Sequence, residues 1–179
     1  MGYYKVLAIQ NQDRALGYKG LYRSEPFPKA GKDKRFLSLW ERYTQYLEPL
    51  LNMGITTELT LDELREYANL ATQDTGDCYE VVFFNESCEC PHEAEYYGID
   101  VTGIGGYSIV GENFFNASNE NGLFATLSEY FRVKANSNGL FNSVEDAMSF
   151  QTVLNDLNTL SPGCVEQEDW RILYVFKVS

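Results

Sequence analysis

The sequence predicts an α+β domain, in which about four helices pack on a largely antiparallel sheet of about five strands. Short runs of β-branched and aromatic residues recur along the chain, and apolar residues recur at helical spacing between these runs. A chain of 179 residues, 44% of them hydrophobic, is long enough for one core and short for two. We therefore expect a single domain over residues 1–179.

Strands are expected where apolar and polar residues alternate, or where β-branched and aromatic residues cluster. The expected strands are residues 3–9, 78–84, 95–101, 107–110 and 170–178. Gly103, Gly105 and Gly106 permit a tight reversal, which predicts a hairpin between the third and fourth strands. The last run is apolar on both faces except at Arg171 and Lys177, so we expect it at the centre of the sheet.

The first two helices have recognisable N-terminal caps. Asp33 can cap a helix over residues 35–53, and Thr60 with Glu63 has the form of a capping box for a helix that reaches about Ala71. The apolar stripe expected on the first helix consists of Leu37, Trp40, Tyr43, Leu47, Leu50 and Leu51. A stripe at this spacing must face a core.

Two further helices are expected in the second half of the chain. One covers residues 122–133, and the other is capped by Ser143 and ends before Pro162. Residues 10–34 contain three glycines, two prolines and several basic residues, so we predict a long irregular basic loop there. Long loops without regular structure are often functional, which makes this segment a candidate contact surface.

The net charge of −12 is large for this length and excludes duplex nucleic acid and an anionic membrane as the main partner, because both need a basic face. The charge is also uneven. Residues 5–42 contain nine basic and four acidic residues, whereas residues 66–129 contain twelve acidic residues and no lysine or arginine. If the acidic side chains gather on one surface, that surface attracts a basic protein.

The acidic segment supplies the candidate binding and catalytic residues. The predicted protein-binding residues are Glu86, Glu89, Glu93, Glu95, Asp100 and Glu112. The alternative is a hydrolase-type enzyme, in which two carboxylates near the 95–110 hairpin act as acid and base, as in glycosidases. The catalytic candidates under this alternative are Glu86, Glu95 and Asp100.

A second alternative is a small zinc-binding module formed by Cys88, Cys90 and His92, which are ligand types that zinc prefers. Cys78 or Cys164 would complete the four ligands. A Cys-x-Cys pair faces one ion less readily than Cys-x-x-Cys, so we interpret this segment as a polar loop with reduced thiols. A cysteine nucleophile with His92 as its general base is a poor fit to the same residues, because no Asn or Asp is placed to orient the imidazole ring. No cofactor is expected.

The class of protein that these observations favour is a non-enzymatic acidic protein-binding domain. Its most concrete example is an immunity or antitoxin-type inhibitor that covers a basic toxin, an analogy that rests on charge alone. The chain lacks a stretch of about 18 apolar residues and the pattern of a signal peptide, so we expect a cytoplasmic protein with reduced cysteines.

Overall fold

The computed structural model describes residues 2–10, 20–22, 26–28, 33–45, 58–103, 134–136, 138, 140–160 and 170–178. In chain order its elements are β1 (Tyr3–Gln10), β2 (Gly20–Tyr22), α1 (Lys34–Thr44), α3 (Leu61–Thr75), β3 (Tyr79–Asn85), β4 (Ala94–Gly103), α6 (Val144–Leu160) and β5 (Trp170–Val178). The strands form one sheet in the order β2-β1-β3-β5-β4, with every neighbouring pair antiparallel. The predicted α+β class is confirmed, as is the interior position of the last strand.

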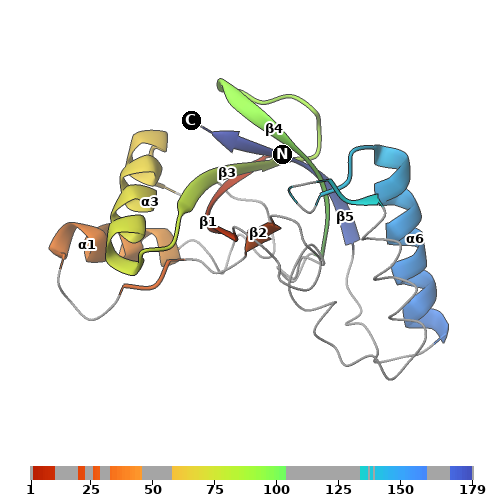
Figure 1. Cartoon of the computed structure of the whole chain (residues 1–179), viewed down its shortest axis with the longest axis horizontal. Helices are drawn as coiled ribbons and strands as arrows, with labels where there is room; N and C mark the ends of the chain where they lie inside the picture. Colours follow the sequence, from red (N-terminus) through yellow and green to blue (C-terminus); the bar gives the residue numbers. More distant parts are fainter. Residues whose placement is uncertain are drawn as a thin grey trace.

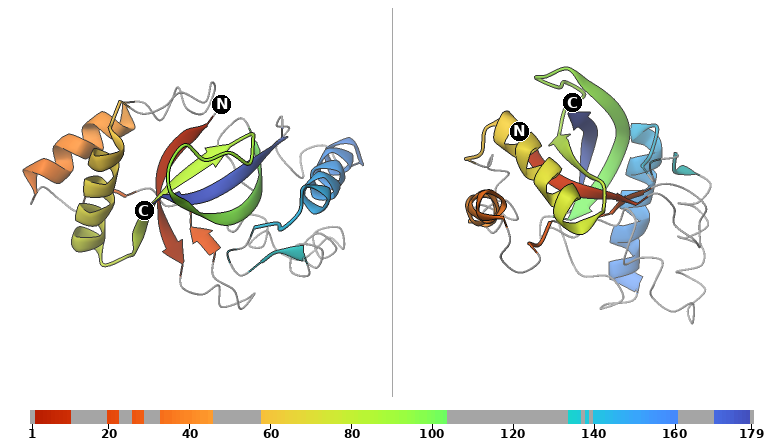
Figure 2. Two further views of the ribbon diagram at one scale, coloured as in Figure 1. Left: turned by 90° about the horizontal axis from the view of Figure 1, so that it is seen from above. Right: turned by 60° about the vertical axis from the view of Figure 1, so that its left-hand side comes forward.

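The sheet lies between two layers of helix. Helices α1 and α3 cover one face and α6 covers the other, as Figures 1 and 2 show. Side chains alternate along each strand, so β3 sends Val81 and Phe83 toward α1 and α3, and Val82 and Phe84 toward α6. Burial on both faces explains why β3 and β5 are nearly continuous apolar runs.

The prediction of an irregular loop over residues 10–34 is wrong in part. β1 extends to Gln10, and β2 pairs with it through Ala8↔Tyr22, Ile9↔Leu21 and Gln10↔Gly20. Three residues are too few to show a period, and their strand geometry comes from pairing with a distant segment. The predicted strand 107–110, its hairpin and the predicted helix 122–133 lie outside the described residues.

Helix α1 begins as expected and differs in its buried face. The Asp33 carboxylate accepts hydrogen bonds from the amides of Arg35 and Phe36, which confirms the cap. The structure describes α1 to Thr44, and residues 46–53 of the predicted helix lie outside the described residues. The fully buried side chains of α1 are Phe36, Leu39 and Tyr43. Leu37 and Trp40 of the predicted stripe are only partly buried, because the face of α1 that packs on α3 is rotated by about one residue from that stripe.

Helix α3 has the predicted capping box, in which Thr60 and Glu63 each bond the other's backbone amide. Its end is set by Gly76, which has a φ of 85°. Two arginines of α1 reach across to α3: Arg35 pairs with Glu66 at 2.6 Å, and Arg42 pairs with Glu63 at 2.5 Å. The Arg42 guanidinium, followed by the Thr60 amide, lowers the pKa of Glu63 to about 2.

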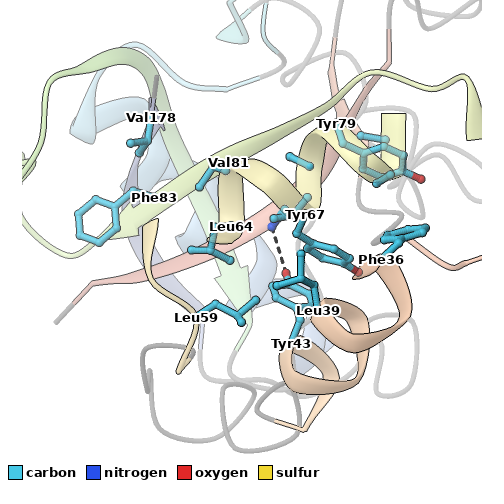
Figure 3. Packing of buried hydrophobic residues seen from close by; sticks show 14 of the residues in the cluster. Phe36, Leu39, Tyr43, Leu59, Leu64, Tyr67, Tyr79, Val81, Phe83 and Val178 are labelled. Atoms are coloured by element: carbon cyan, nitrogen blue, oxygen red, sulfur yellow. Dashed lines mark hydrogen bonds between the residues drawn. The ribbon is translucent and has the colours of Figure 1, made fainter. Parts of the chain in front are cut away.

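Two buried tyrosines, one from α1 and one from α3, bond backbone groups of segments far from them in the sequence (Figure 3). The hydroxyl of Tyr43 accepts a hydrogen bond of 3.0 Å from the Val6 amide, which lies beyond the end of the β1–β2 pairing. The hydroxyl of Tyr67 donates to the carbonyl of Pro26 at 3.1 Å. The two rings are 5.0 Å apart and fully buried. These hydroxyls therefore satisfy the Val6 amide in β1 and the Pro26 carbonyl outside the sheet.

The outer edge of β4 is covered by a turn that precedes α6. Ile99 and Phe141 exchange both of their backbone hydrogen bonds, and the Asn136 side chain donates to the carbonyl of Tyr97 at 2.9 Å. Leu140 packs directly on Gly98, whose φ is 142°. Covering an edge strand in this way removes unpaired backbone groups that would otherwise attract another strand.

Candidate protein-binding surface

Three of the predicted binding residues, Glu86, Glu89 and Glu93, lie on the connection between β3 and β4. β3 and β4 are both antiparallel to β5, which lies between them, so they run parallel to each other. Parallel strands cannot be joined by a tight turn, and the chain must cross the sheet. In this protein residues 86–93 connect the end of β3 to the start of β4 across β5, and they contain no helix. We call residues 86–93 the crossover segment.

A row of aromatic rings runs across four strands on the α3-facing side of the sheet. Tyr4, Phe83, Phe176 and Tyr96 occupy neighbouring register positions on β1, β3, β5 and β4. Successive ring centroids are 4.7, 6.4 and 5.5 Å apart. Phe83 and Phe176 are buried, whereas Tyr96 at the edge of the sheet is 48% exposed. Cross-strand aromatic pairs of this kind stabilise a sheet and hold each ring in place.

The crossover segment packs against this aromatic row. The ring of His92 lies 6.0 Å from that of Tyr4, and Cys90 packs on the same core cluster. Partial burial, followed by the neighbouring Tyr174 and Cys88, raises the pKa of Tyr96. The Asn85 side chain donates to the carbonyl of Glu89 at 2.7 Å and shapes the start of the segment. Packing on the sheet therefore fixes the backbone that carries the glutamates.

The crossover segment and the first residues of β4 present four exposed glutamates. Glu86 pairs with Arg171 at 3.5 Å, with both side chains about half exposed. Glu89, Glu93 and Glu95 are exposed, and no lysine or arginine occurs between residues 86 and 95. We call these four glutamates the acidic crossover surface; Glu95 projects from the α6-facing side of β4, opposite Lys177, whereas Tyr96 lies on the α3-facing side with Phe176.

The remaining predicted binding residues do not belong to this surface. Asp100 is 2% exposed on β4 and is therefore out of reach of a protein partner in the folded state. Glu112 lies outside the described residues. Elsewhere in the acidic segment, Glu66 and Glu80 form ion pairs with Arg35 and Lys177. The acidic surface is thus narrower than the sequence predicts.

The three catalytic candidates are separated along the sheet. Glu95 is opposite Lys177 at one end of β5, Asp100 is opposite Leu173, and Glu86 pairs with Arg171 toward the other end. General acid–base chemistry requires two carboxylates to flank one bond. Glu86 and Glu95 are exposed and Asp100 is buried, so these carboxylates do not converge on a common site.

A polar network that the sequence analysis missed lies on the α6-facing side of the sheet. The two oxygens of Glu80 accept hydrogen bonds from Lys177 Nζ at 2.6 Å and from Tyr97 Oη at 2.7 Å. Tyr97 occupies the irregularity in the β4–β5 register, and its ring is 9% exposed. The sequence held one sign of this network: Glu80 and Lys177 are residues of opposite charge within two largely apolar strands, which favours an ion pair between them.

This network is expected to make the protein sensitive to alkaline pH. Burial, followed by the hydrogen bond to Glu80, raises the pKa of Tyr97 above 10.0, and the hydrogen bond to Glu80 raises the pKa of Lys177 above 10.5. A group whose pKa is higher in the folded than in the unfolded protein stabilises the fold at pH values below its unfolded pKa. This stabilisation is lost as the pH rises. The free energy of unfolding in urea should fall above about pH 10, and less steeply in Tyr97→Phe. Equal slopes in the two proteins would contradict this assignment.

The zinc hypothesis gains no support from the placement of its ligands. Cys88 and His92 lie near different ends of the aromatic row, beside Tyr96 and Tyr4. Cys78 is placed near Tyr97 and Lys177, on the other face. Within the described residues no three histidine, cysteine or acidic side chains are placed to hold one ion. Cys164 lies outside those residues.

In the described part of the chain, no helix has both the length and the apolar character needed to cross a membrane. No protein-family model matches the chain, and comparison with curated proteins and with solved structures finds no match either.

Proposed function

We propose that this protein is a non-enzymatic acidic domain that binds a basic protein through the acidic crossover surface. The observation that supports the proposal is that Glu89, Glu93 and Glu95 are exposed on a segment that contains no lysine or arginine. Exposed charges of one sign speed association with an oppositely charged partner and require no catalytic geometry. An immunity or antitoxin-type inhibitor of a basic toxin is the most concrete form of this function.

The packing of the crossover segment adds to this argument. A binding surface loses less conformational entropy when its backbone is already ordered. Here Cys90 and His92 pack on the sheet, and Asn85 bonds the Glu89 carbonyl. The glutamates project from this ordered segment, which favours recognition of a defined partner over nonspecific attraction of cations.

The direct test mixes the purified protein with the purified products of the genes that flank its own and measures binding by titration calorimetry. We expect a basic product to bind, and its Kd to rise steeply between about 0.05 and 0.3 M salt because exposed charges are screened. If none of the basic products binds, or if the Kd is independent of salt, the proposal fails.

A matched pair of variants tests the location of the surface. The triple variant Glu89→Gln, Glu93→Gln and Glu95→Gln should weaken binding at low salt by at least about tenfold. The control carries Glu41→Gln, Glu145→Gln and Asp156→Asn, which are equally exposed on α1 and α6 and remove the same charge. An equal loss in the control would show that net charge, rather than this surface, attracts the partner.

A further inference from the structure

The outer edge of β4 is covered over only part of its length. β4 is the last strand of the sheet among the described residues, and the turn at residues 136–141 bonds it from Tyr97 onward. The residues before this point are accessible, because Glu95 is exposed and Tyr96 is 48% exposed. An uncovered edge strand presents backbone groups that another strand can bond. We call residues 94–96 the open edge.

Alternation along β5 determines which backbone groups of the open edge face outward. The turn takes up the bonds of the β4 residue opposite Tyr174, so the backbone groups of Tyr174 point away from β4. The direction reverses at each residue of a strand, so those of Lys177 point toward Glu95. Glu95 therefore bonds inward, and the N–H and C=O groups of Ala94 and Tyr96 face outward, without a partner among the described residues.

The side chains of the open edge point to two different faces of the sheet. Glu95 lies on the α6-facing side, and Tyr96 lies on the α3-facing side at the end of the aromatic row. On a strand added to this edge, the residue opposite Glu95 would meet a carboxylate, and its neighbour opposite Tyr96 would meet an aromatic ring. Side chains directly opposite each other on neighbouring strands interact. The open edge therefore favours a strand in which basic and apolar residues alternate.

Charge decides between a basic strand and a second copy of this chain. The cation opposite Glu95 in register is Lys177, whose ammonium is bonded to Glu80. Glu89 and Glu93 add exposed carboxylates on the segment that leads into the open edge, and that segment contains no lysine or arginine. Two copies paired antiparallel about Glu95 would set two carboxylates opposite each other, which is destabilising. A basic strand is attracted instead.

We propose that the basic partner adds an extended strand to the open edge, antiparallel to β4, with a basic residue opposite Glu95 and an apolar residue opposite Tyr96. In strand addition, main-chain hydrogen bonds supply affinity, and side chains at alternate positions supply specificity. This inference rests on the proposed function and gives the partner's binding segment both a conformation and a sequence pattern.

The experiment uses a short capped peptide in which arginine and valine alternate, and two N-methylated forms of it. When arginine lies opposite Glu95, the N–H groups of the valines face β4 and those of the arginines face away. We expect the peptide methylated on its arginines to bind the full chain at low salt like the unmodified one. The peptide methylated on its valines should bind at least about tenfold more weakly, because it cannot donate to the edge.

Hydrogen exchange locates the contact within the chain. On addition of the unmodified peptide, the amides of Ala94 and Tyr96 should become protected by at least about tenfold. The Glu95 amide already points toward β5 and should change little. Protection that does not include Ala94 and Tyr96 would contradict the proposed pairing.

A substitution at the start of β4 removes one outward donor and keeps every glutamate. Proline is tolerated at the first residue of a strand, so Ala94→Pro should fold, which circular dichroism checks. It should bind the unmodified peptide at least about fivefold more weakly than the parent. Ala94→Ser is the control, because it retains the N–H group and should bind like the parent.

The outcomes distinguish this inference from the proposed function. If Ala94→Pro binds the basic partner as well as the parent while the triple glutamine variant does not, strand addition is refuted and the proposed function stands. Equal binding of the two methylated peptides also refutes strand addition, because charge alone then explains the attraction. If the open-edge amides are protected at high protein concentration without peptide, the occupant is a second copy and the inference is overturned. If the unmodified peptide does not bind, the inference fails, and calorimetry with the neighbouring gene products still decides the proposed function.

Discussion

Gly98→Ala is expected to destabilise the protein by about 3 kcal/mol or more, through backbone strain and overpacking together. The φ of 142° at Gly98 is one that side-chain-bearing residues rarely adopt. A Cβ there would lie 2.7 Å from Leu140 Cβ, 2.8 Å from Asn136 Nδ2 and 2.9 Å from the Phe141 carbonyl oxygen. Either the turn that covers β4 or the strand itself must move. Urea unfolding monitored by circular dichroism measures the loss.

Gly76→Ala is the control for this substitution. Gly76 also has a positive φ, of 85°, but no atom lies within 4 Å of the position that a Cβ would take. Its replacement should cost about 1 kcal/mol, from backbone conformation alone. The excess loss at Gly98 then measures the contact between the turn and the edge of the sheet. Equal losses at the two glycines would mean that this contact contributes little.

Tyr43→Ala is the second substitution for which we expect a large effect, about 3 to 5 kcal/mol, because it removes a fully buried ring between α1, α3 and the sheet. Tyr43→Phe isolates the hydroxyl. It keeps the ring and leaves the Val6 amide without its acceptor, which should cost about 1 to 3 kcal/mol. Denaturant unfolding of both variants gives the two contributions.

Hydrogen exchange identifies the group that is affected in Tyr43→Phe. The Val6 amide should exchange faster relative to the amides of Val81 and Val82, which lie in the interior strand β3. A uniform change across all three amides would show global destabilisation and would contradict the assignment of the Tyr43 hydroxyl to Val6.

The sequence located the acidic surface only in part, for a reason that its individual residues make clear. Glu89, Glu93 and Glu95 are exposed and Asp100 is buried, although all four belong to the same acidic stretch. Composition shows charge, but exposure depends on how β4 is covered by the turn at residues 136–141. The exposure of Tyr96 carried no signal of its own, because it comes from the place of its ring at the edge of an aromatic row that includes Phe176.

Local interactions were readable from the sequence alone. Asp33, the Thr60–Glu63 pair and Ser143 were recognised as helix caps because capping bonds join residues two or three positions apart. The interior position of β5 was also readable, since a strand buried on both faces must be apolar on both faces. These features depend on neighbouring residues or on burial, and the amino-acid sequence encodes both directly.

Only the tertiary structure decided which segments meet. β2 pairs with the end of β1 across an intervening segment, the Glu80–Lys177 contact spans 97 positions, and residues 86–93 cross the sheet because β5 lies between β3 and β4. Such contacts form because the whole sheet fixes their register, and no local period records them. The surface that we propose for binding is therefore a product of strand order, to which the sequence contributes the charge.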